Sequence, residues 1–117
     1  MRADKDYIKD VLDAIKKIEE FIDGMDYNEF LEDVKTQYAV VRALEIIGEA
    51  VKNISDKLKK KYPEIPWKAI AGMGDKLIHA YFGVDWEVVW LTVKKDIPKI
   101  KPVFEKLLNE VEGGENV

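Results

Sequence analysis

The sequence predicts an all-α protein, an up-and-down bundle of about five or six helices. Apolar residues recur at three- and four-residue spacing along most of the 117 positions, which is the period of an amphipathic helix. No window rich in β-branched residues alternates between apolar and polar side chains, so no strand is predicted. The stretches between the periodic segments are short, and short connections are typical of helical bundles.

The first two helices are predicted from residues 4–23 and from the residues after Asp26. Gly24 ends the first helix. Asp26, followed three residues later by Glu29, resembles a capping box and therefore indicates a second, shorter helix. The apolar faces of the two helices consist of Tyr7, Ile8, Val11, Leu12, Ile15, Ile18, Phe21, Ile22, Tyr27, Phe30, Leu31 and Val34.

Residues 36–53 are predicted to form the longest helix, and Ser55 can cap a further helix that is rich in lysine. Residues 62–66 should be an extended linker, because the residue before a proline is disfavoured in a helix. The apolar face of the long helix consists of Val40, Val41, Leu44, Ile47, Ala50, Val51 and Ile54.

Pro66 suits the start of a helix over residues 67–81, and the chain should break at residues 82–85. Asp85 can cap the next helix, which contains Trp86 and Trp90. Pro98 is expected to open the last helix, which should end before Gly113. These elements predict one helical domain over residues 1–112 and a disordered tail over residues 113–117.

The amino-acid composition argues against a membrane protein and a secreted protein. The chain is 47% hydrophobic and 36% charged, and no apolar run approaches the roughly 20 residues of a membrane span. It has no cysteine, and its charged N-terminus does not resemble a secretory signal, so we expect a cytoplasmic protein without a membrane association. A net charge of −4 argues against a protein that coats nucleic acid, although the lysines of residues 57–61 and 94–101 provide local positive potential.

The candidate for acid–base chemistry is His79, the only histidine of the chain. Asp75 lies four residues earlier, so the two side chains share one helix face. Tyr81 reaches the same side only if the helix ends or bends near Phe82 and Gly83. The alternative is a packed, hydrogen-bonded core histidine without chemistry. One histidine and no cysteine fall short of a four-ligand metal site, so no metal is expected. The sequence also has no phosphate loop or dinucleotide-binding fingerprint, and no other cofactor is expected.

Two further clusters leave alternatives open. Arg42, Glu45, Glu49 and Asn53 form a polar row on the longest helix, which is either a solvated face with helix-spaced ion pairs or a polar groove. Aromatic residues gather after the histidine, where they either stack on bases or belong to the core or an interface. These residues are Tyr81, Phe82, Trp86 and Trp90.

The sequence as a whole resembles the HEPN superfamily, specifically its HepT-like branch of toxin ribonucleases. The resemblance lies in RALEIIGEAVK (42–52), YPEIPWK (62–68), IAGM (70–73) and LIHAYFGVD (77–85), with Val89-Trp90 and Asp96-Ile97-Pro98 near the end. It implies an all-helical homodimer whose active groove lies between the subunits and which cuts RNA without a metal.

The resemblance also implies the roles of the motif residues. A ribose 2′-hydroxyl attacks the adjacent phosphate, His79 moves the proton and Asp75 is its polar partner. Gly74 occupies the place of the family's arginine, which is expected to offset the developing negative charge, so an impaired nuclease is predicted. Lys76 points to nearly the opposite helix face and is a poor substitute, whereas Arg42 could reach the groove.

Family membership further implies a toxin–antitoxin system with a nucleotidyltransferase antitoxin of the MNT type. In related systems such a partner attaches AMP to the motif tyrosine, and Tyr81 is the matching position. Whether the chain is an enzyme stays open because of Gly74. The alternatives are a non-catalytic helical dimer that binds a nucleotidyltransferase or nucleic acid, and a plain structural bundle with a buried histidine.

Overall fold

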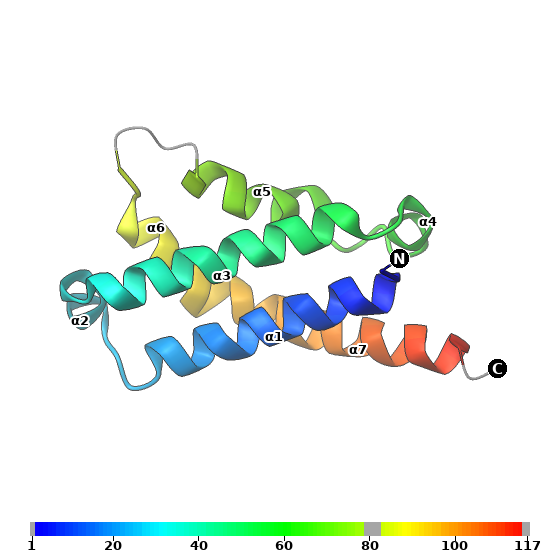
Figure 1. The fold of residues 1–117 in the computed structure, drawn as a ribbon, viewed down its shortest axis with the longest axis horizontal. Helices are drawn as coiled ribbons and strands as arrows, with labels where there is room; N and C mark the ends of the chain where they lie inside the picture. The colour runs from blue at the N-terminus through cyan, green and yellow to red at the C-terminus, as the bar shows by residue number, and fades with distance from the viewer. Residues whose placement is uncertain (1, 79–82, 116–117) are drawn as a thin grey trace.

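The computed structural model describes residues 2–78 and 83–115, and this part of the chain contains helices and no strand. The all-α prediction is therefore confirmed. Three long helices, α1, α3 and α7, run roughly along the longest axis of the molecule (Figure 1). In chain order the elements are α1 (Asp4–Ile22), α2 (Tyr27–Glu32), α3 (Val34–Asn53), α4 (Asp56–Lys61), α5 (Trp67–Ile78), α6 (Trp86–Leu91), the π-helical turn η1 (Thr92–Asp96) and α7 (Ile97–Glu115).

The helix starts expected from capping residues are confirmed. The Asp26 carboxylate accepts a 2.8 Å hydrogen bond from the Glu29 amide, and the Asp26 amide donates to the Glu29 carboxylate at 3.1 Å. Ser55 Oγ accepts from the Leu58 amide at 3.2 Å, and the Asp85 carboxylate accepts from the Glu87 amide at 3.1 Å. Each cap satisfies a backbone donor that has no partner within its helix.

One cluster of buried apolar side chains holds the helices together. α3 packs against both α1 and α5, and α7 packs against α1. Each of these helices has an apolar stripe that faces the cluster, so burial of apolar surface is the main stabilising contribution. The largest fully buried side chains are Phe30, Phe104, Ile8, Ile15, Ile18, Leu44, Ile47, Ile70, Ile97, Leu107, Val11 and Val40.

The structure corrects the last helix. The chain does not begin a new helix at Pro98, because α6, η1 and α7 follow one another without a break. A proline cannot donate the usual hydrogen bond to the carbonyl four residues earlier. The wider turn of η1, in which the Ile97 amide donates to the Thr92 carbonyl, lies immediately before Pro98 and lets the helix continue.

The predicted end of this helix before Gly113 is also wrong, because α7 runs through Gly113 and Gly114 to Glu115. A glycine costs a helix only about 1 kcal/mol relative to alanine, which a long helix tolerates.

Gln37 is buried and connects α2 to α3. Its Nε2 donates to the carbonyls of Phe30 and Leu31 at 3.0 and 3.1 Å, and its relative exposure is 6%. We expect Gln37→Met to lower the free energy of unfolding by about 1–2 kcal/mol, because the hydrogen bonds are lost while the side-chain volume is kept. Urea denaturation measures the change. Lys35→Met on the same helix is the control, and an equal loss in both variants would contradict this role of Gln37.

Candidate functional site

The described part of the motif that the sequence singled out, residues 74–78, lies at the end of α5. Gly74 and Asp75 are in the last part of this helix, which remains helical through Gly74. Ile70 of α5 is 1% exposed and fixes the helix on the core, while the Asp75 side chain is 47% exposed. His79 and Tyr81 lie outside the described residues, so their expected approach to Asp75 stays a prediction.

Asp75 forms an ion pair with Lys52 of α3. Lys52 Nζ lies 2.7 Å from Asp75 Oδ1 and 3.9 Å from the Glu49 carboxylate. Hydrogen bonding to Asp75, followed by the Coulomb attraction of Asp75 and Glu49, raises the pKa of Lys52 above its ordinary value. A lysine is already protonated at neutral pH, and the raised pKa keeps the Lys52 ammonium charged to higher pH. Sequence reasoning missed this contact because the two residues are 23 positions apart.

The polar row on α3 forms short-range contacts within its own helix. Arg42 Nη1 lies 3.2 Å from Glu45 Oε2, at the i,i+3 spacing of helical ion pairs. Asn53 Nδ2 donates to the Glu49 carbonyl at 2.8 Å. Arg42, Glu49 and Asn53 line a shallow hollow beside α1 together with Arg2, Tyr7, Asp10, Ile46 and Ala50. This arrangement favours a solvated face, and a groove that includes Arg42, Glu45 and Glu49 stays a prediction.

The tryptophans of α6 pack against α2. The ring centroids of Trp86 and Trp90 lie 5.9 and 5.1 Å from that of Phe30, which is fully buried. Trp90 also lies 6.1 Å from Tyr27. These contacts favour the interpretation that Trp86 and Trp90 are partly buried residues that pack against the core, rather than a base-stacking platform.

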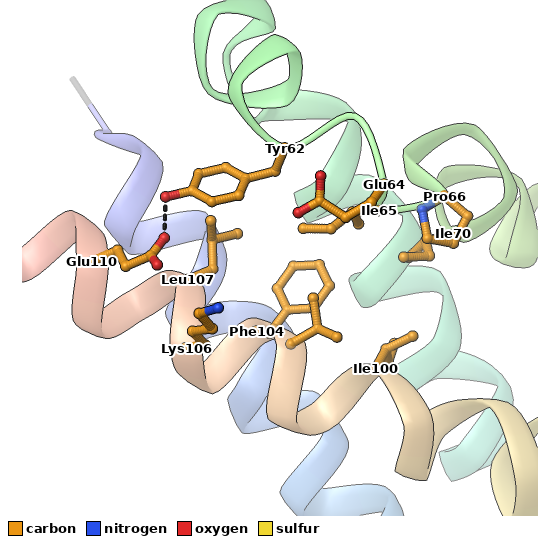
Figure 2. Close-up of a pocket in the computed structure, with 11 residues that line it drawn as sticks. Tyr62, Glu64, Ile65, Pro66, Ile70, Ile100, Phe104, Lys106, Leu107 and Glu110 are labelled. Carbon is orange, nitrogen blue, oxygen red and sulfur yellow. Dashed lines mark hydrogen bonds between the residues drawn. The ribbon is translucent and has the colours of Figure 1, made fainter.

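A separate apolar cavity of about 210 Å³ lies between the linker of residues 62–66 and α7. Figure 2 shows Tyr62 reaching from the linker toward Glu110, while Phe104 lies in the middle of the wall. The Tyr62 hydroxyl donates to the Glu110 carboxylate, which raises the pKa of Tyr62 because the neutral phenol is the donor. The cavity adjoins the start of α5, whereas Gly74 and Asp75 lie near the end of that helix. It is lined by Tyr62, Glu64, Ile65, Pro66, Ile70, Ile100, Val103, Phe104, Lys106, Leu107 and Glu110.

The described residues show neither a metal-ligating cluster nor a membrane-spanning helix. Residues 2–78 and 83–115 contain no group of three or more histidine, cysteine, aspartate or glutamate side chains that could hold a metal ion. In the same ranges, no helix has the length and apolar character needed to cross a membrane.

Comparison with known proteins identifies the family. The model of the family described as "Ribonuclease HepT-like" matches residues 11–107. The chain belongs to the HepT-like ribonuclease family. The match includes α3, the linker of residues 62–66 and the whole of α5, so it covers every residue of the candidate site.

Individual relatives agree with this assignment. The chain is 59% identical over 106 residues to "Probable ribonuclease HepT" of Thermococcus cleftensis, an alignment that covers 91% of this chain and 96% of the relative. It is 50% identical over 109 residues to "Putative RNase MJ1216" of Methanocaldococcus jannaschii, with 93% of this chain and 90% of the relative covered. No solved structure gives a significant match. A ribonuclease-type function in this HepT-like chain is thus supported by relatives that span nearly its full length.

Proposed function

We propose that this chain is the toxin subunit of a toxin–antitoxin system and a metal-independent RNA endonuclease whose activity is impaired by Gly74. The observation that carries the proposal is the family match across residues 11–107. The described part of the motif, residues 74–78, lies at the end of α5, and the Asp75 side chain there is exposed enough to meet a ligand. The substrate class follows from the ribonuclease names of the family and its members.

The reaction follows from the residue types. The ribose 2′-oxygen attacks the neighbouring phosphorus, His79 accepts the 2′-hydroxyl proton, and the bond from phosphorus to the 5′-oxygen breaks. The 5′-oxygen takes up a proton and leaves as a hydroxyl, so the other product carries a 2′,3′-cyclic phosphate. Asp75 serves as the polar partner of His79, and a cation is needed to offset the negative charge that builds on the phosphate oxygens.

A homodimer accounts for the need for both an acid and a base, because each chain has one histidine. A twofold dimer brings two equivalent sets of residues to one groove. Apart from the motif, α3 and α6 leave large apolar side chains exposed in the single chain, which a second copy of the chain would cover. They are Val34, Tyr38, Val88 and Leu91, with relative exposures of 58%, 71%, 52% and 42%.

The proposed antitoxin is an MNT-type nucleotidyltransferase that attaches AMP to Tyr81. The added phosphate charge repels RNA at the groove, which gives the modification a physical reason. Incubation with such an enzyme and ATP is expected to add the mass of one AMP to this chain. The Tyr81→Phe variant should gain no mass, and modification of that variant to the same extent would contradict Tyr81 as the target.

Cleavage of modified RNA tests the mechanism. We expect the chain, at high concentration and in the presence of EDTA, to cut an RNA oligonucleotide slowly and to leave a 2′,3′-cyclic phosphate. An oligonucleotide of the same sequence with 2′-O-methyl groups should stay intact, because its 2′-oxygen has no proton to lose. Equal cutting of both substrates would overturn the proposed mechanism.

The glycine at position 74 also supports a second candidate function. In this alternative the chain is a non-catalytic dimer that binds a nucleotidyltransferase or nucleic acid. The motif of this chain lacks the cation that the reaction needs. This alternative predicts that neither RNA nor 2′-O-methyl RNA is cut while binding to either partner is kept.

A further inference from the structure

We propose that Lys52 contacts RNA phosphate beside the motif and supplies part of the positive charge that Gly74 removes. The inference rests on the proposed function, because it assumes that RNA binds at the end of α5. It concerns a residue of α3, outside the motif segment itself.

The position of the ammonium group carries the argument. Lys52 Nζ lies 2.7 Å from Asp75 Oδ1, and Asp75 directly follows Gly74. The long lysine side chain therefore brings a cation from α3 to the part of α5 where the arginine of the motif is missing. Within residues 2–78 and 83–115, the ion pair of Asp75 is with Lys52.

The ammonium also has donors left for a second anion. A lysine has three N–H donors, and Asp75 accepts one of them at 2.7 Å. The Glu49 carboxylate, at 3.9 Å, is beyond hydrogen-bond distance. The Lys52 side chain is 39% exposed, so an incoming phosphate can reach it. One lysine can thus bridge Asp75 and a phosphate oxygen.

The competing interpretation is that Lys52 only fastens α5 to α3. The two interpretations predict opposite effects for Asp75→Asn. If Lys52 is only a tether, Asp75→Asn and Lys52→Met remove the same contact and should act in the same direction. If Lys52 contacts phosphate, Asp75→Asn removes a repelling carboxylate and releases the ammonium, so RNA should bind more tightly.

Binding of a 2′-O-methyl RNA oligonucleotide, measured by fluorescence anisotropy in EDTA at several salt concentrations, tests the inference. We expect Lys52→Met to weaken binding about threefold, the scale of an exposed charge pair. In the same variant, the slope of the logarithm of the binding constant against the logarithm of the salt concentration should be smaller in magnitude by about 0.7. This is the change expected when one phosphate contact on a single strand is lost. Lys52→Arg should keep the affinity, and Asp75→Asn should raise it.

Lys17 and Asp13 are the matched control pair, because they form an exposed ion pair on α1 at 3.0 Å. Lys17→Met and Asp13→Asn change the net charge by the same amounts at a different place. They should alter RNA affinity less than the corresponding variants of Lys52 and Asp75. Equal effects at both pairs, or weaker binding in Asp75→Asn, would overturn the role of Lys52.

The background of Gly74→Arg separates this inference from the proposed function. With arginine restored, the charge of Lys52 is partly redundant, and Lys52→Met should weaken binding less than it does with Gly74. If Gly74→Arg shows no cleavage that depends on His79, the proposed nuclease function fails. If it shows such cleavage but Lys52→Met leaves RNA binding unchanged in both backgrounds, only the role of Lys52 fails.

Discussion

Replacing Gly74 with arginine is expected to raise the rate of RNA cleavage a hundredfold or more. Donors that stabilise developing negative charge typically contribute about 3 kcal/mol to transition-state stabilisation. Position 74 already lies in a regular helix that packs on α3, so an arginine needs no change of backbone. The same substitution should stabilise the helix by about 1 kcal/mol, because glycine is a poor helix former.

Single-turnover cleavage of one RNA oligonucleotide by the chain as given and by Gly74→Arg measures the effect. Gly74→Ala is the control, because it improves helix propensity without adding a charge, and it should leave the rate low. The double variant Gly74→Arg with His79→Ala should lose the gain. A Gly74→Arg variant that is folded, binds RNA and cuts no faster than Gly74→Ala would overturn the proposed role of this position.

Phe104→Ala is expected to lower the free energy of unfolding by about 3–5 kcal/mol, the range for deletion of a buried phenylalanine. The Phe104 ring is fully buried and forms an edge-to-face contact with Trp67 at a centroid distance of 6.0 Å. It also forms the central part of the cavity wall in Figure 2, so its removal enlarges an existing void.

Urea denaturation measures this loss, and Val103→Ala is its control. Val103 is the neighbouring residue on α7 and is 38% exposed, so its truncation should cost much less. Because Trp67 begins α5, the loosened contact should also reduce the hydrogen-exchange protection of the amides in this helix. A loss no larger than that of Val103→Ala would show that Phe104 is not central to the core.

The local elements were predictable because their signals are local. The capping carboxylate of Asp26 and the hydroxyl of Ser55 bind amides three residues away, so their positions in the sequence indicate where helices begin. The prediction failed at Pro98. Proline is favoured at the first position of a helix, but the π-helical turn that lets the helix continue through Pro98 has no comparable sequence signal.

The candidate site was predictable in part. The motif and its missing arginine follow from the residues at positions 74–81 and from their resemblance to a family. The ion pair that joins Lys52 to Asp75 was not predictable, since it depends on how α3 packs against α5. The cavity beside Tyr62 was missed for the same reason, because its walls come from the linker and from α7.

The sequence by itself therefore determined the helical class, most helix starts, the candidate motif and its lack of an arginine, since each depends on residue type and short-range spacing. Only the tertiary structure decided that Trp86 and Trp90 pack on Phe30 and that Lys52 reaches the end of α5. The physical reason is that helix periodicity fixes which side chains share a face, whereas the choice of the facing partner depends on the packing of the whole core.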